Sequence, residues 1–228
     1  IRSSNNAAYA LAEYVSHGDV YDFVDKMNER ARSMGLDSLR YCTPHGLPPG
    51  NTGTCMDQGN AYDIYKLAMT AIQYPEYMKI ADKSSDYIKD GTIQLKATNN
   101  LLGKVEGVDG LKTGYHKAAG SNIVLTAERD GLRMIAVVMG SEKSKNRDTV
   151  GADEINSFFS TYKKSKIVDS NKAIATIKIS NKDYSLYPSE DVEEIININN
   201  FDASKIEYKF NVIKTLPRKI KNGEVLGD

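Results

Sequence analysis

The segment DGLKTGYHKAAG, residues 109–120, holds residue types that could recognise a substrate carboxylate. Lys112 can supply a fixed positive charge to that carboxylate or to a reacting hydroxyl. Thr113 adds a hydroxyl that can bind the same carboxylate, and Gly114 leaves room for a substrate backbone to lie against a strand. The alternative interpretation is a plain turn, because glycine breaks regular structure and this triplet also occurs by chance.

A second polar group stands at the start of the chain, where Ser3, Ser4 and Asn5 precede a run with helical periodicity. Serine and asparagine cap helices, and capping alone would explain these residues. Serine enzymes that recognise penicillins, however, combine a Ser-x-Asn element and a Lys-Thr-Gly element with a Ser-x-x-Lys element. The chain carries the Ser-x-Asn element and, later in the sequence, the Lys-Thr-Gly element, and this combination favours a shared catalytic role.

The order of segments along the chain resembles that of the D-alanyl-D-alanine carboxypeptidases, the low-molecular-mass penicillin-binding proteins of the S11 serine peptidase family. The resemblance covers essentially the whole chain and rests on five segments: SSNNAAYALAE, FVDKMNERARSMGL, TPHGLPPG, DGLKTGYHKAAG and NRDTVGADEI. It implies an α+β catalytic domain of the penicillin-binding-protein and β-lactamase type, with helices on an antiparallel sheet. A small all-β domain is expected to follow.

The resemblance also implies a reaction, the removal of the terminal D-Ala from a peptidoglycan stem peptide that ends in D-Ala-D-Ala. A serine forms an acyl-enzyme, and water then releases the trimmed peptide. β-Lactam antibiotics are expected ligands, and the chemistry needs no metal or organic cofactor. By motif, the implied catalytic residues are Ser3, Asn5 and Lys112, and the implied substrate-binding residues are Thr113, Gly114, Tyr115, His116 and Arg147.

The family gives these residues separate roles. Ser3 would relay a proton towards the leaving group, and Asn5 would hold a substrate amide and the catalytic lysine. The backbone near His116 would border the oxyanion hole. Arg147 would anchor the terminal carboxylate directly or through Thr113, and the alternative for Arg147 is a surface arginine at a helix start.

The nucleophile of this reaction is not found in the chain. The family's Ser-x-x-Lys element precedes the Ser-x-Asn element, where this chain begins. The match from Ser160 to Lys163 falls late in an apolar-faced helix after the Lys-Thr-Gly element, so we attribute it to chance. We expect the nucleophile on an upstream segment or a separate chain. Two alternatives stay open: an inactive wall-binding or scaffolding relative, and a β-lactamase, for which Glu106 and Asp109 are the nearby carboxylates.

Cys42 and Cys55 lie in a loop-like stretch that is rich in proline and glycine. A disulfide between them would fit an extracytoplasmic protein. Two free thiols are the second interpretation. A metal site at Cys42, His45 and Cys55 is the third, although it has no evident fourth ligand and matches no standard zinc spacing.

The composition of the 228 residues is that of an ordinary globular protein. Thirty basic and thirty acidic residues cancel, so nucleic acid is not an expected partner. No apolar run approaches the roughly 20 residues that span a bilayer. Both ends look cut. The resemblance to the carboxypeptidases implies a protein at the outer face of the bacterial cytoplasmic membrane with a C-terminal amphipathic helix as its anchor, and we expect that this anchor has been removed.

Apolar periodicity and capping residues predict the elements that position these motifs. Two hairpins are expected, around Asp90-Gly91 and around residues 129–131, and the strand at 132–140 reads as a central strand because it is apolar on both faces. We place residues 1–165 in the catalytic domain and residues 166–228 in the β-rich domain, a spacer. Helices are expected from Asn5 or Asn6 to Val15, from Asp19 to Met34, over 61–72, from Pro75 and over 149–162.

Overall fold

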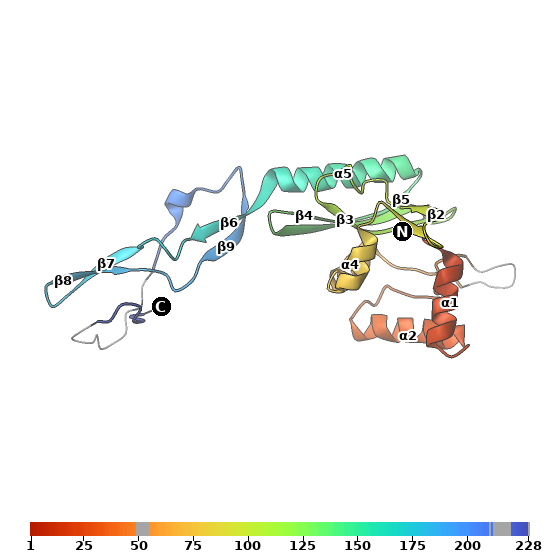
Figure 1. The fold of residues 1–228 in the computed structure, drawn as a ribbon, viewed down its shortest axis with the longest axis horizontal. Helices are drawn as coiled ribbons and strands as arrows, with labels where there is room; N and C mark the ends of the chain where they lie inside the picture. The colour runs from red at the N-terminus through yellow and green to blue at the C-terminus, as the bar shows by residue number, and fades with distance from the viewer. Residues whose placement is uncertain (49–54, 210, 212–219, 228) are drawn as a thin grey trace. The chain divides into compact units, whose positions relative to one another are not determined.

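A computed structural model describes residues 1–48, 55–209, 211 and 220–227 (Figure 1). The chain divides into two compact units, Ile1–Phe159 and Ser160–Asp228. The division falls six residues before the domain boundary that we expected. The difference arises because strand β6 (Tyr162–Val168) begins before Lys166 and pairs along its length with β9 (Val192–Asn197).

Helix α1 (Asn5–Val15) begins one residue earlier than a cap at Asn5 would allow. Its cap is Ser4, whose hydroxyl accepts a hydrogen bond from the Ala7 N–H at 3.3 Å. Serine and asparagine cap equally well, so the sequence alone did not separate them. The side chain of Asn5 is therefore not used to cap the helix.

The next three helices start where Asp19, the periodicity from Ala61 and Pro75 predict. Asp19 caps α2 by accepting from two backbone N–H groups, Asn60 caps α3, and Pro75 occupies the first turn of α4, where its missing N–H is not needed. The helices span α2 (Val20–Ser33), α3 (Ala61–Ala71) and α4 (Pro75–Ala81).

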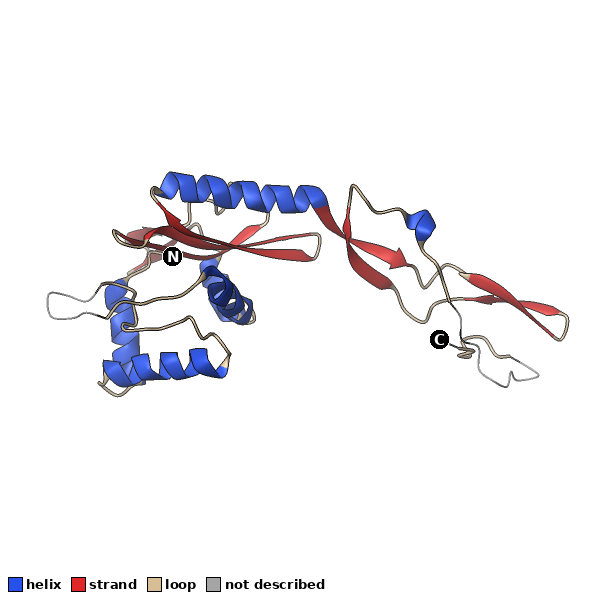
Figure 2. Ribbon diagram, turned by 180° about the vertical axis from the view of Figure 1, so that it is seen from behind, coloured by secondary structure: helices blue, strands red, loops and turns tan. Residues whose placement is uncertain are grey.

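A three-stranded antiparallel sheet of order β3-β4-β5 lies at the centre of the first unit (Figure 2). Its strands are β3 (Val108–His116), β4 (Gly120–Arg129) and β5 (Leu132–Ser141). Asp130 and Gly131 connect β4 to β5 with φ of 49° and 73°, as the type I′ turn of a two-residue hairpin requires. The Lys-Thr-Gly triplet lies on β3, at one edge of this sheet.

The prediction of a central strand at 132–140 is wrong for the described residues. β4 is the central strand, and β5 pairs with β4 alone. Apolar side chains on both faces of a strand indicate that both faces of the sheet are covered. They do not indicate whether a neighbouring strand forms hydrogen bonds along each edge, which is what makes a strand central. Part of β5 also stays uncovered, since Met139 is 44% exposed.

Helix α5 (Ser144–Thr161) covers one face of the sheet and starts five residues before the expected position (Figure 1). Leu125 of β4 and Ile155 of α5 are fully buried in the core between them. Gly151 permits this close approach, because a Cβ at that position would lie 2.5 Å from Cδ1 of Leu125. On the opposite face, α4 reaches β3 at Gly110.

The apolar side of α1 is largely uncovered in the described chain. Leu11 and Val15 lie on this apolar side, yet they are 64% and 52% exposed, and Ala12 is the only buried residue of the helix. Periodicity shows which side of a helix is apolar, and only the tertiary structure shows whether another element covers it.

Two further hairpins occur in the described part of the chain. β1 (Ser85–Ile88) and β2 (Ile93–Lys96) enclose the predicted Asp90-Gly91 turn. In the second unit, β7 (Ala175–Ile179) pairs with β8 (Lys182–Leu186), and a 3₁₀ turn at Ala203–Lys205 follows the last described strand, β9. The expected α+β fold is thus confirmed.

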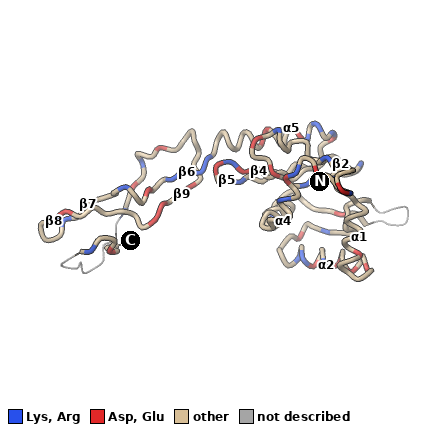
Figure 3. The backbone as a smooth tube through the Cα atoms, viewed as in Figure 1, with Lys and Arg blue, Asp and Glu red and all other residues tan. Residues whose placement is uncertain are grey.

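Charged residues of both signs are intermixed along the chain (Figure 3). In the second unit, Lys164 pairs with Glu193, and Lys166 pairs with Asp191. Within the described residues, no helix combines the length and apolar character that crossing a membrane requires.

Candidate active site

Ser3 and Lys112 meet in the structure although 109 residues separate them. Lys112 Nζ donates to Ser3 Oγ at 2.8 Å and also contacts the carbonyl oxygen of Thr113. Ser3 comes from the segment that enters α1, and Lys112 comes from β3. The fold therefore joins the two motifs that the sequence shows separately.

The environment of Lys112 favours proton transfer. Partial burial of the ammonium lowers the pKa of Lys112 below its ordinary value, because desolvation disfavours the charged form. The side chain is still exposed in the described chain, so a ligand can reach it. A hydroxyl bonded to such an amine can take part in general acid–base chemistry.

Thr113 points to the other side of β3 from Lys112, as strand alternation requires. It is 7% exposed, and its Oγ1 lies 2.6 Å from Oγ1 of Thr98, which follows β2. The threonine hydroxyl of the triplet is therefore held by a second threonine. Nothing in the sequence alone singled out Thr98.

The strand beyond Thr113 offers an open surface. A Cβ added at Gly114 would meet nothing nearer than 4.0 Å, so the strand itself does not require glycine there. Tyr115 is 71% exposed, and His116 ends β3 with Nδ1 accepting a hydrogen bond from the Ala118 N–H. Among the described strands β3 pairs with β4 alone, so its other edge beside these residues can accept an extended peptide.

Asn5 stands at the first helical position of α1 and is half-buried. Its side chain has no hydrogen-bond partner among the described residues, whereas Ser4 next to it is occupied with capping. An amide with free donors and an acceptor beside Ser3 can hold a substrate amide or a second polar side chain.

Arg147 lies behind the sheet, and no hydrogen bond joins it to Thr113 among the described residues. It is 4% exposed, its guanidinium pairs with Asp148 at 2.6 Å, and its Nη1 donates to the Asn122 carbonyl at 3.3 Å. Asn122 is the β4 partner of Gly114. The alternative of a surface arginine is wrong, because the side chain is buried and hydrogen-bonded within the fold.

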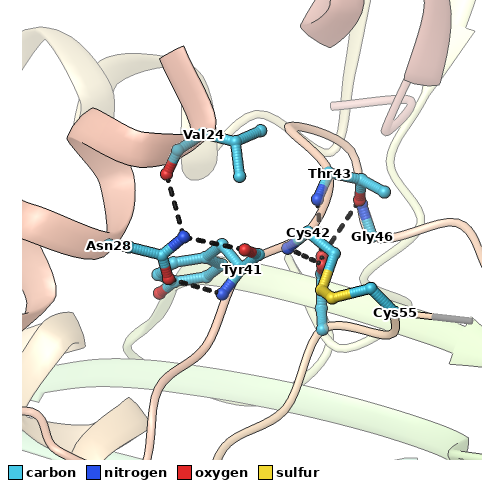
Figure 4. Close-up of a disulfide and its surroundings, with 8 residues drawn as sticks. Val24, Asn28, Tyr41, Cys42, Thr43, Gly46 and Cys55 are labelled. Atoms are coloured by element: carbon cyan, nitrogen blue, oxygen red, sulfur yellow. Dashed lines mark hydrogen bonds between the residues drawn. A yellow bond between two sulfur atoms is a disulfide. The ribbon is translucent and has the colours of Figure 1, made fainter. Parts of the chain in front are cut away.

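Cys42 and Cys55 form a disulfide (Figure 4). The Asp57 carboxylate accepts hydrogen bonds from the backbone N–H groups of Cys42 and Thr43, which fixes the start of this loop. The metal site considered at these cysteines and His45 is not formed, because both sulfur atoms are bonded to each other. Among described residues, no cluster of three metal-ligating side chains occurs.

Residues 1–143 match the family model described as D-alanyl-D-alanine carboxypeptidase. The chain belongs to this family. Among curated relatives, the D-alanyl-D-alanine carboxypeptidase DacF of Bacillus subtilis is 29% identical over 233 residues, covering 100% of this chain and 58% of DacF. The chain thus spans little more than half the length of this carboxypeptidase.

Solved structures of the family have the same fold. Penicillin-binding protein 5 of Haemophilus influenzae is similar over 99% of this chain and 64% of that protein, with 27% identity and a TM-score of 0.67. Penicillin-binding protein D2 of Listeria monocytogenes, solved in an ampicillin-bound form, is similar over 68% of this chain and 62% of that protein, with 30% identity and a TM-score of 0.59.

Proposed function

We propose that the complete protein is a serine-type D-alanyl-D-alanine carboxypeptidase of peptidoglycan. One observation carries the proposal: the Ser-x-Asn serine and the Lys-Thr-Gly lysine form a hydrogen bond at 2.8 Å, although they are distant in sequence. If the two motifs were only a helix cap and a turn, nothing would require the lysine side chain to bind the serine hydroxyl.

In the proposed reaction, a serine outside the described chain attacks the carbonyl of the penultimate D-Ala. The ester to the enzyme forms as the bond to the terminal D-Ala breaks, and the departing amine takes a proton that Ser3 and Lys112 relay. Asn5 holds a substrate amide, and Thr113 binds the terminal carboxylate beside the free edge of β3. Water then hydrolyses the ester.

A segment that carries Ser-x-x-Lys has to complete this site. The uncovered side of α1, with Leu11 and Val15 exposed beside the Ser3 segment, is where we propose that it packs. The greater length of the carboxypeptidase DacF supports such a segment. The disulfide supports a position outside the cytoplasm, and a C-terminal anchor to the membrane remains part of the proposal.

The proposal is tested by intact mass spectrometry of the protein encoded by the complete gene, before and after exposure to benzylpenicillin. We expect one penicilloyl adduct on a protein heavier than these 228 residues, and release of D-Ala from a peptide ending in D-Ala-D-Ala. A complete protein that gains no adduct and releases no D-Ala would leave the inactive scaffold as the better account.

Neither alternative is favoured by an observation. A β-lactamase needs a carboxylate that activates water near the nucleophile. Of the two candidates, Asp109 is paired with Arg133 at 2.8 Å, and Glu106 is an exposed side chain 4.0 Å from Arg129. Rapid turnover of benzylpenicillin without a stable adduct would be the result that favours a β-lactamase.

A further inference from the structure

Thr98 touches both motif segments of the candidate site. Its backbone N–H donates to the Ile1 carbonyl at 3.2 Å, which holds the segment that carries Ser3. Its Oγ1 lies 2.6 Å from Oγ1 of Thr113 on β3. One residue between β2 and the following turn thus connects the Ser-x-Asn segment with the Lys-Thr-Gly strand.

The neighbouring Asn99 gives Thr98 a fixed place relative to β3. Asn99 is 8% exposed, its Nδ2 donates to the Gly110 carbonyl at 3.1 Å, and its Oδ1 accepts from the Leu101 N–H at 3.0 Å. Buried side chains with both ends hydrogen-bonded leave little freedom to the backbone that carries them. The Thr98 hydroxyl is therefore placed by the fold and not by chance contact at the surface.

The direction of the hydroxyl pair follows from the proposed substrate. A threonine hydroxyl has one proton and two acceptor positions. If Thr113 donates its proton to a substrate carboxylate, it has none left for Thr98, so Thr98 must donate to Oγ1 of Thr113. A donor on that oxygen strengthens the outgoing hydrogen bond, because chains of hydrogen bonds polarise one another.

We propose that Thr98 is a positioning residue that turns the Thr113 hydroxyl towards the terminal carboxylate of the substrate. The inference rests on the proposed function and names the part of the substrate that Thr98 controls. Thr98 then contributes to selection of a free C-terminal carboxylate over a neutral end, without touching the substrate itself.

The test compares Thr98→Val and Thr98→Ser in the complete protein, with two peptides that differ only in a free or amidated C-terminal D-Ala. Valine keeps the shape and the backbone N–H but removes the hydroxyl. We expect Thr98→Val to lower kcat/KM for the free acid about 3- to 10-fold, mainly through KM, and to leave the value for the amide unchanged. Thr98→Ser should restore the preference for the acid.

Two comparisons keep the inference falsifiable. Thr92→Val is the matched control, because Thr92 Oγ1 donates to the Lys89 carbonyl in the β1–β2 turn, away from Thr113. This variant should leave kcat/KM unchanged for both peptides. In a Thr113→Val background, Thr98→Val should cause no further loss, because the hydroxyl it orients is gone. Equal losses for the acid and the amide, or an unchanged acid-to-amide ratio, would overturn the inference.

The same measurements separate the two proposals. If the unmodified complete protein neither releases D-Ala nor gains a penicilloyl adduct, the proposed function fails. If the unmodified protein is active and Thr98→Val keeps the full preference for the free acid at an unchanged melting temperature, only the role of Thr98 fails.

Discussion

At the scale of single residues, the contact of Ser3 with Lys112 joins chemistry that the sequence distributes over two distant segments. The lysine is exposed and makes no ion pair among the described residues, so the fold has little need of its charge. Its partial desolvation instead destabilises the charged form. A lysine whose charged form is destabilised without a compensating ion pair is a candidate for function rather than for stability.

Replacing Lys112 with glutamine should therefore reduce function far more than folding. We expect Lys112→Gln in the complete protein to acylate with benzylpenicillin about 10²- to 10⁴-fold more slowly, because a proton-transfer group is lost. The melting temperature should change little. Lys112→Arg is the control for charge, and it should not restore the rate, since guanidinium does not release its proton. Acylation at the unmodified rate in Lys112→Gln would contradict the role of the lysine.

Asp63 gives the structure a local dependence on pH. Its carboxylate contacts Lys66 at 2.9 Å and accepts from the Ser38 N–H, and these partners lower its pKa to about 2. The folded-state pKa lies below the ordinary value, so the stabilisation is complete above about pH 4 and is lost as the pH falls through about 2.

We expect Asp63→Asn to melt at a lower temperature than the unmodified protein at neutral pH, with the difference shrinking between about pH 4 and pH 2. Thermal unfolding followed by circular dichroism over this range measures it. In Lys66→Met the acid-induced loss should move to higher pH, because the main cause of the low pKa is removed. A difference that does not depend on pH would show that the carboxylate charge is irrelevant.

At the scale of elements, β3 is placed by the turn before it as much as by β4. Gly107 has a φ of 75°, and its carbonyl accepts from the Glu128 N–H at 3.0 Å. A Cβ at Gly107 would lie 2.4 Å from the Glu128 carbonyl oxygen. Backbone this close leaves room only for glycine, and the approach sets where the Lys-Thr-Gly strand begins.

Gly107→Ala should destabilise the protein by more than the roughly 1–2 kcal/mol that a left-handed conformation costs an alanine. Gly103→Ala is the matched control, because Gly103 has a similar φ of 72° but nothing within 4 Å of its added Cβ. The difference between the two variants in urea unfolding isolates the clash with Glu128. Equal destabilisation would mean that the backbone simply moves aside.

At the scale of the whole molecule, the described residues of the first unit form two separate small cores rather than one. One lies between α5 and the sheet around Leu125, and the other lies around Leu36. Large apolar side chains of α1 remain outside both. Uncovered apolar surface of this kind is typical of a face that another segment or protein covers.

This surface makes a measurable prediction. The isolated 228-residue chain should bind a hydrophobic dye such as ANS more strongly than the complete protein does. Leu11→Ser with Val15→Ser should reduce the dye signal of the isolated chain, because both side chains are exposed on α1. Tyr187→Ser, which changes an exposed side chain of the second unit, serves as the control. Equal dye binding by the isolated chain and the complete protein would contradict a covering segment.

Much of the local structure was predictable because its causes are local. Asp19, Asn60 and Pro75 mark helix starts through hydrogen bonds within one turn, and Asp130-Gly131 marks a hairpin through its own dihedral angles. The candidate site was predictable in part, since order along the chain related Ser3 to Lys112. The hydrogen-bond partners of Arg147, Asp148 and the Asn122 carbonyl, were not predictable, because the fold brings them to the guanidinium.

The sequence by itself thus determined the family, the α+β class, most helix boundaries and the residue types of the site, because propensity, capping and motif order depend on near neighbours. The tertiary structure alone decided which strand is central, which side of α1 stays uncovered, that Lys112 donates to Ser3, and that Thr98 holds Thr113. Those outcomes depend on distances between segments that are far apart in the chain, and local sequence patterns do not determine such distances.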